Sequence, residues 1–368
     1  VKDNGGRDLP QVTFNTNIPV KRNNLTTVYG PVLTDSNNIT VTIKEAFENG
    51  TEWNPEDDKY DVEVISGPYT ETITLKTGNY FFKNVTVTTT TGPAIQIEED
   101  AVVTIDVQGI LKLVGATDGI AVPNSSKLTI NGISETRAEG KFGNLNVVAK
   151  GGYGIGGIGA DVTIKNTTID YICGWPVQPL FEKDPSYGKS EPEGFSAIGG
   201  AKITLDNVEI KKAEGGSKAA AIGNKYWAAT NVVIKGSTLG DIFGGNASAA
   251  IGGSRYNKKN KQSINIVIEG STITNAVGGT YGAGIGSGYD TYCATNDSNA
   301  VNKIEISTST ITAKGGKYAA GIGTGHHAAA LTGSIDAASN INATSGDESY
   351  CDESGYGRLN TVAQGIGY

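Results

Sequence analysis

The chain has 368 residues, with 51 glycines, no methionine and a formal net charge of −8. Abundant Gly, Ser, Thr and Asn is typical of an all-β protein with many tight turns, and a hydrophobic share of 38% is too high for a disordered chain. The acidic balance argues against binding nucleic acid or anionic lipid over a large area, and no apolar run reaches the ~18 residues that a membrane-spanning helix needs.

Residues 1–60 show no regular pattern, and short strands separated by Gly, Asn and Pro begin after them. We expect residues 1–60 to cap one end of the fold formed by residues 61–368, because an uncovered end would expose strand edges. The chain begins at Val1 and stops at Tyr368, within a repeat. This predicts a mature or trimmed piece whose helix is completed by further chain or by a partner chain.

From residue 154 one unit recurs, in which a small residue, Ile and Gly follow one another. It stands at Gly154-Ile155-Gly156, Gly157-Ile158-Gly159, Ala197-Ile198-Gly199, Ala221-Ile222-Gly223, Ala250-Ile251-Gly252, Gly284-Ile285-Gly286, Gly321-Ile322-Gly323 and Gly365-Ile366-Gly367. We expect each Ile to fill the core, with small neighbours that let the chain bend without a clash at Cβ. From Ile198 the intervals are 24, 29, 34, 37 and 44 residues, which predicts rungs of constant size and a loop that lengthens directly after each unit.

Each interval also carries two short runs of alternating apolar and polar residues, such as Ile203–Leu205 and Val208–Ile210. A period of two predicts strands. These two strands and the Gly-Ile-Gly unit make three strands per repeat, which predicts a triangular coil. The predicted fold is therefore all-β, a single-stranded right-handed parallel β-helix, which is a solenoid. The Pro-rich segment 174–194 does not fit a rung, and we expect it to be a long excursion.

Stacking in register predicts that the residues after each Gly-Ile-Gly form one surface column. Aromatic and polar side chains recur there, namely Tyr226, Trp227, Arg255, Tyr256, Tyr289, His326 and His327. An aromatic ring can stack on the apolar face of a sugar while fixed polar groups bond to its hydroxyls. We therefore expect a substrate-binding site for an oligosaccharide or glycan, against the alternative that the rings only cover the edges of the rungs.

The loop after Tyr289 carries two carboxylates seven residues apart, Asp290 and Asp297. A loop that doubles back would bring them within about 5–9 Å, the separation of the two catalytic carboxylates of glycosidases. An apolar surround would hold a proton on one of them near neutral pH. Two solvated aspartates and a calcium site are the alternatives, and no other cofactor or metal is expected.

The string Gly284-Ile285-Gly286-Ser287-Gly288-Tyr289-Asp290, with Asp297 further on, resembles the lacto-N-biosidases of glycoside hydrolase family 136 over roughly residues 280–330. The resemblance implies a right-handed β-helix of gut bacteria that releases lacto-N-biose from milk oligosaccharides by a retaining mechanism. It implies Asp290 as the acid/base and Asp297 as the nucleophile. The other rungs share only the Gly-Ile-Gly pattern, which many bacterial surface proteins also have.

Three functions are therefore expected. The first is a glycoside hydrolase, secreted or at the bacterial cell surface. The second is a non-catalytic glycan-binding domain of a surface adhesin. The third is a polysaccharide lyase, for which the basic run Arg255, Lys258, Lys259 and Lys261 would hold a uronate carboxylate. Neither nucleic acid nor insertion into a membrane is expected.

Three cysteines are present, and none forms a C-x-x-C pair. Cys293 and Cys351 follow successive Gly-Ile-Gly units, so a disulfide between them is one alternative, which would leave Cys173 free.

Overall fold

The computed structural model describes residues 25–29, 40–44, 63–133, 143–175, 194–225, 229–255, 263–289, 302–326, 328, 332–346 and 366–367. The chain divides into two compact units, Val1–Asp61 and Val62–Tyr368. In the first unit, β1 (Leu25–Tyr29) and β2 (Thr40–Lys44) pair antiparallel, with Leu25 opposite Lys44. The capping role expected of this segment stays a prediction.

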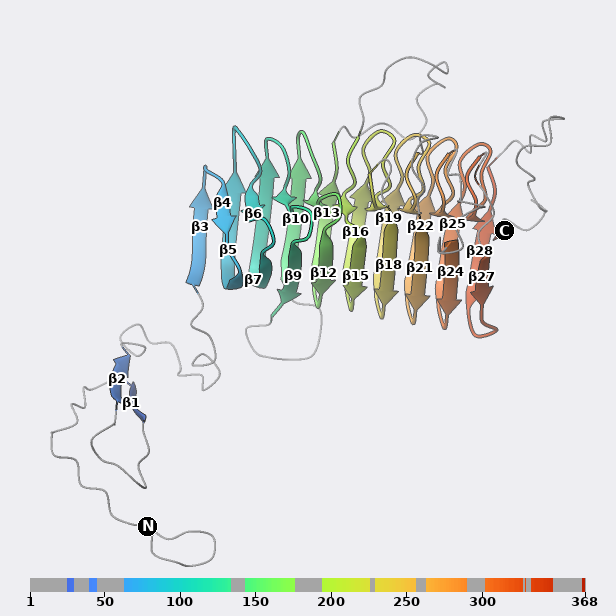
Figure 1. Cartoon of the computed structure of the whole chain (residues 1–368). Helices are drawn as coiled ribbons and strands as arrows, with labels where there is room; N and C mark the ends of the chain where they lie inside the picture. Colours follow the sequence, from blue (N-terminus) through green and yellow to red (C-terminus); the bar gives the residue numbers. More distant parts are fainter. Residues whose placement is uncertain are drawn as a thin grey trace, which may run out of the picture. The chain divides into compact units, whose positions relative to one another are not determined.

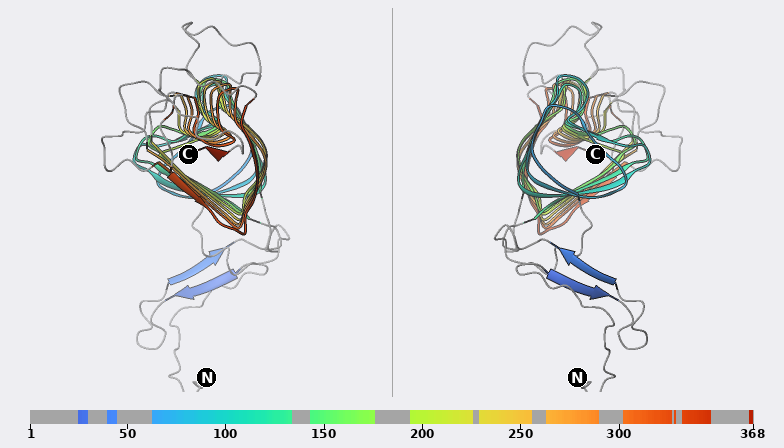
Figure 2. Two further views of the ribbon diagram at one scale, coloured as in Figure 1. Left: turned by 90° about the vertical axis from the view of Figure 1, so that its right-hand side faces the viewer. Right: turned by 90° about the vertical axis from the view of Figure 1, so that its left-hand side faces the viewer.

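The second unit is a parallel β-helix, which confirms the predicted fold (Figure 1). Its coils superimpose when they are viewed along the helix axis (Figure 2). Each coil adds one strand to each of three parallel columns, and adjacent strands of a sheet lie about 4.8 Å apart. Within the described residues, no helix is long and apolar enough to cross a membrane.

The first two columns carry the longer strands. Three strands run through both columns: β3 (Glu63–Tyr69), β5 (Gly78–Thr88) and β7 (Val102–Gly115). The first column continues with β9 (Lys127–Gly132), β12 (Asp161–Lys165), β15 (Lys202–Asp206), β18 (Thr230–Lys235), β21 (Ile264–Glu269), β24 (Asn302–Ser307) and β27 (Thr332–Ile335). The second continues with β10 (Asn144–Ala149), β13 (Thr168–Cys173), β16 (Glu209–Glu214), β19 (Thr238–Phe243), β22 (Thr272–Val277), β25 (Thr310–Lys314) and β28 (Asn340–Thr344).

The third column is made of very short strands, and we call it the isoleucine column. Its members are β4 (Ile73–Leu75), β6 (Ile95–Ile97), β8 (Ile120–Ala121), β11 (Ile155–Gly156), β14 (Ile198–Gly199), β17 (Ile222–Gly223), β20 (Ile251–Gly252), β23 (Ile285–Gly286), β26 (Ile322–Gly323) and β29 (Ile366–Gly367). The register places isoleucine opposite isoleucine from Ile73 to Ile366. From Ile95 to Ile322 these side chains are buried in one hydrophobic core.

Glycine follows the isoleucine for two physical reasons. Gly286 has a φ of 137°, a backbone conformation that L side chains rarely adopt. A Cβ at Gly286 would also collide with the carbonyl oxygen of Gly323 in the next rung. Gly156, Gly223, Gly252 and Gly286 are all too close to the next rung for a side chain, which explains the repeated Ile-Gly pair, whereas the earlier rungs carry Thr74, Gln96 and Ala121 at this position.

Two expectations about the repeat were wrong in part. Ile158 does not belong to the isoleucine column, and its side chain is 53% exposed, because Gly157-Ile158-Gly159 forms the turn between β11 and β12. The loop does lengthen directly after the unit in the intervals that start at Ile198, Ile222, Ile251 and Ile285. In the last interval the added length lies between β28 and β29 instead.

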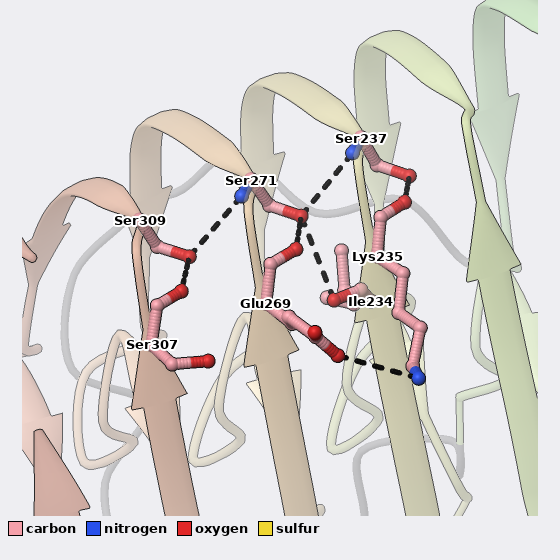
Figure 3. Close-up of polar contacts among 7 residues, drawn as sticks. All are labelled: Ile234, Lys235, Ser237, Glu269, Ser271, Ser307 and Ser309. Carbon is pink, nitrogen blue, oxygen red and sulfur yellow. Dashed lines mark hydrogen bonds and ion pairs between the residues drawn. The ribbon is translucent and has the colours of Figure 1, made fainter. Parts of the chain in front are cut away.

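The turn between the first and second columns repeats one backbone conformation. Its residues with positive φ are Asn166, Asn207, Gly236, Gly270 and Thr308, all between 47° and 56°. The next residue is often serine, and these serines form a ladder along the helix (Figure 3). The amide of Ser237 donates to Oγ of Ser271 at 3.2 Å, and the amide of Ser271 donates to Oγ of Ser309 at 3.1 Å. The hydroxyls thus satisfy buried amides that the tight turn leaves without a strand partner.

Candidate functional site

Around Ile222, Ile251, Ile285 and Ile322 the backbone folds back on itself, and we call this feature the pinch. Two residues before the isoleucine, the amides of Ala249, Ala283 and Ala320 donate to carbonyl oxygens that lie two residues after it. Their acceptors are Gly253, Ser287 and Thr324, at 2.9, 3.0 and 3.1 Å. Ala219 and Lys225 form an antiparallel bridge around Ile222. The pinch therefore brings together side chains that lie four residues before and four residues after the same isoleucine.

At the last two complete pinches these positions hold aromatic side chains. Tyr281 precedes Ile285 by four residues and Tyr289 follows it by four, and Tyr318 and His326 stand in the same places around Ile322. Parallel stacking then sets one pair above the other, so the four rings form a two-by-two cluster, which we call the aromatic array. Tyr281 and Tyr318 stack at 5.4 Å between centroids with 11° between their planes. Tyr289 and His326 stack at 5.6 Å and 28°.

Contacts across the array complete the cluster. The ring centroids of Tyr281 and Tyr289 lie 5.3 Å apart, and those of Tyr318 and His326 lie 5.1 Å apart. Tyr289 is 8% exposed, and the other three rings are half-buried. Such a fixed set of half-buried rings presents the same polar edge to any ligand, with little conformational entropy left to lose.

Two cations lie over rings at the margins of the array. The guanidinium carbon of Arg255, one rung earlier, lies 5.7 Å from the centroid of Tyr289. The Lys317 ammonium lies 5.1 Å from the centroid of Tyr318. A cation over a ring face is attracted by the negative charge of the π system. Tyr289 and Tyr318 therefore each meet both a neighbouring ring and a cation, and the array offers a ligand ring edges, phenol hydroxyls and imidazole.

Of the residues predicted from sequence, Arg255, Tyr289 and His326 lie in one column, one rung apart. Tyr226, Trp227, Tyr256, His327, Asp290 and Asp297 lie outside the described residues. Tyr281, Tyr318 and Lys317 were missed by sequence reasoning. Their signal was a tyrosine four residues before the isoleucine in Tyr281-Gly-Ala-Gly-Ile285 and Tyr318-Ala-Ala-Gly-Ile322. Half of the array therefore precedes the Gly-Ile-Gly unit, whereas the predicted column contained only residues that follow it.

A second polar cluster lies several rungs earlier at the same edge. The carboxylate of Asp118 accepts a hydrogen bond of 2.7 Å from the amide of Tyr153, and burial raises the pKa of this carboxyl. The Tyr153 ring meets Phe195 edge to face at 5.2 Å, and the Lys225 ammonium lies 3.7 Å from the centroid of Phe195. Burial, and then the charge of Asp118, raise the pKa of the Tyr153 hydroxyl, so that this group stays protonated.

Cys173 is a free, buried thiol, and burial raises its pKa, so it is not an activated nucleophile. The disulfide considered between Cys293 and Cys351 falls outside the described residues. Within the described part of the chain, no group of three or more His, Cys, Asp or Glu side chains could hold a metal ion. The calcium alternative concerned Asp290 and Asp297, which that part does not include.

Comparison with known proteins gives one match. Residues 3–88 match a family model described as a family of unknown function, DUF6562. The matched segment ends in β5 and does not include the aromatic array. No curated protein matches the chain, and no solved structure matches it. The resemblance to glycoside hydrolase family 136 therefore stays an expectation from sequence.

Proposed function

We propose that this protein binds a carbohydrate chain at the aromatic array, as a secreted or cell-surface glycan-recognition protein. The observation that carries the proposal is the two-by-two cluster of Tyr281, Tyr289, Tyr318 and His326 between Arg255 and Lys317. Phenol hydroxyls and imidazole nitrogens donate and accept hydrogen bonds, whereas the two cations only donate. A ligand rich in hydroxyls and other oxygens, as a glycan is, matches this mixture.

The contact expected from the array differs from the one predicted from sequence. Stacking of a sugar face on a ring face needs an open ring face, but Tyr289 and Tyr318 each meet both a ring and a cation. Recognition here uses hydrogen bonds from hydroxyls and cations, with ring edges against the apolar parts of the sugar. This kind of contact fixes the orientation of the ligand more strictly than stacking does.

The test is binding to an immobilised glycan panel that includes lacto-N-tetraose and a uronate polymer. Tyr318→Phe removes one hydroxyl from the array, and we expect it to weaken binding about three- to tenfold, the value of one or two hydrogen bonds. Tyr69→Phe is the matched control, because this phenol lies on β3 and bonds only weakly to the carbonyl of Ser66 at 3.3 Å. Equal affinity of the two variants, or no binding to any glycan, would refute the proposal.

Hydrolysis of the bound glycan is the second candidate. The observation that favours it is that Asp290 directly follows Tyr289 of the array, so the loop with the two predicted catalytic carboxylates starts at the site. We expect the parent protein to release a disaccharide from lacto-N-tetraose, and Asp290→Asn and Asp297→Asn each to lose activity by a factor on the order of 10⁴. Asp241→Asn is the control, because Asp241 is an exposed residue on β19. Binding without product would leave the protein as a non-catalytic adhesin domain.

A further inference from the structure

The residues around the isoleucine column differ in charge from the rest of the chain. We call isoleucine edge the five described segments within four residues of Ile198, Ile222, Ile251, Ile285 and Ile322, which are 194–202, 218–225, 247–255, 281–289 and 318–326. The chain has 38 Asp and Glu among 368 residues, yet none of these segments contains one. These five segments of an acidic protein therefore contribute no carboxylate of their own, although the buried Asp118, in the rung of Ile120, interacts electrostatically with Lys225.

Cations are present on the same edge. Lys218 stands four residues before Ile222, in the place that Tyr281 and Tyr318 take in later rungs, and Lys225 and Arg255 follow their isoleucines. Lys317 borders the last segment. Lys202, at the end of the first segment, belongs to β15 and pairs with Asp161 at 3.6 Å, so it is not part of the edge surface.

Several acidic side chains of the neighbouring columns are paired with lysines. On the outer faces of the first two columns, Lys235 pairs with Glu269 at 3.3 Å, Lys211 with Asp170 at 2.6 Å and Lys212 with Glu214 at 2.8 Å. At physiological ionic strength the potential of a charge decays over about 8 Å. The local charge of the edge therefore decides what it attracts, more than the net charge of −8 does.

Three of these cations lie against an aromatic ring. Lys225 lies over Phe195, Arg255 over Tyr289, and Lys317 over Tyr318. Where their faces meet cations and other rings, the rings present edges, which carry the positive part of the ring quadrupole. Ring edges and cations together make a strip that favours negatively charged oxygens. Its four rung steps of about 4.8 Å give it a length of roughly 19 Å, more than one sugar ring can contact.

We propose that the ligand is an acidic polysaccharide, a chain of uronate or similarly charged sugars, that lies along the isoleucine edge from Phe195 to the aromatic array. This inference rests on the proposed glycan binding and names its substrate class. The array fixes one part of the chain, and Lys225, Arg255 and Lys317 meet carboxylates that recur along it. Single-stranded nucleic acid fits less well, since base stacking needs open ring faces and Tyr289 and Tyr318 each meet both a ring and a cation.

The experiment measures the affinity of the whole chain by calorimetry for oligogalacturonates of two to six units. Their fully methyl-esterified forms serve as matched neutral ligands, and an oligothymidylate of similar length is a third probe. We expect affinity to rise with length for the acids, to fall for the esters, and to weaken as salt is raised. Lys225→Met, Arg255→Met and Lys317→Met should each weaken acid binding about two- to fivefold. Lys112→Met, an exposed lysine on β7, should not.

Three results would overturn the inference. Esters that bind as tightly as the acids would show that charge is not recognised. Affinity that stops rising at the disaccharide would confine the ligand to the array. Tighter binding of the oligothymidylate than of the hexa-galacturonate would assign the edge to nucleic acid. If neutral glycans bind and Tyr318→Phe weakens them, the proposed function stands and only this inference fails. If no glycan binds, both fail.

Discussion

The backbone amide of His326 donates a hydrogen bond of 2.9 Å to the carbonyl oxygen of Tyr281, one rung earlier. The amide of Tyr289 makes the same bond at 2.8 Å to Ala247. In each case the residue four places after one isoleucine is tied to the residue four places before the preceding one. The positions of the array are thus set by backbone bonds that do not depend on the ring side chains.

A ring of the array can therefore be removed without loss of the fold. We expect His326→Ala to lower the free energy of unfolding by about 1 kcal/mol, the value of its ring contacts. Glycan affinity should fall by a factor of about ten. Circular dichroism with thermal melting and calorimetric titration of the glycan measure the two effects. A variant that keeps full affinity would remove His326 from the site.

The isoleucine column should be the most sensitive part of the core. Ile285→Ala deletes buried methyl groups between two rungs that are held close together by glycine backbone, so the cavity cannot collapse. We expect a loss of about 3–5 kcal/mol in denaturant unfolding. Ile158→Ala removes the same atoms from a side chain that is 53% exposed, and should change stability by less than about 0.5 kcal/mol. Similar losses in both variants would contradict the assignment.

Ile155 and Ile158 show which part of the fold the sequence pattern predicts and which part it does not. Both stand in Gly-Ile-Gly, so local pattern cannot separate them, and only the register of the neighbouring rungs does. Conversely, Ile73, Ile95 and Ile120 belong to the column without the full Gly-Ile-Gly unit, so the unit alone does not define the column. Tyr281 lies beside Tyr289 because the hydrogen bond from Ala283 to Ser287 folds the backbone back around Ile285. The periodicity of the sequence does not encode this tertiary feature.

Backbone conformation separates two classes of glycine. Gly270 has a φ of 56°, and a Cβ added there would have no atom within 4 Å. Gly270→Ala should therefore lower the free energy of unfolding by about 1 kcal/mol, the strain of a left-handed backbone conformation. In Gly286→Ala the new Cβ would also collide with the carbonyl oxygen of Gly323, so the loss of stability should be several times larger. Thr308→Gly should stabilise the protein by about 0.5–1 kcal/mol, because Thr308 holds a φ of 47°. Urea unfolding of the three variants measures these changes in stability and ranks them.

Removal of a single hydroxyl from the serine ladder should lower the stability of the protein. Ser271→Ala leaves the buried amide of Ser237 without its acceptor and removes the donor to the carbonyl of Glu269. We expect a loss of about 1–3 kcal/mol and faster hydrogen exchange at the Ser237 amide. Ser334→Ala, at an exposed position of β27, is the control and should be neutral. Unchanged exchange at Ser237 would mean that the ladder does not protect this amide.

Asp118 predicts a pH dependence of stability. Burial raises its pKa in the folded protein, while the hydrogen bond from the amide of Tyr153, the hydroxyl of Thr117 and the charge of Lys225 act in the opposite direction. A carboxyl whose pKa is higher in the folded than in the unfolded state binds its proton more tightly when folded. Its contribution to stability is therefore fully present below the unfolded value of about 3.9 and is lost as pH rises through the folded value.

Asp118→Asn should remove this dependence. The amide oxygen of asparagine can still accept the hydrogen bond from Tyr153 but carries no charge to bury, so at pH 7 the variant should be at least as stable as the parent. The gap between the two should narrow as pH falls through the raised pKa towards 4. Urea unfolding at several pH values between 3.5 and 8 measures it. A parent that loses stability relative to Asp118→Asn as the pH falls would show that the carboxylate is favoured in the fold, as a partner of Lys225, and that burial does not control its pKa.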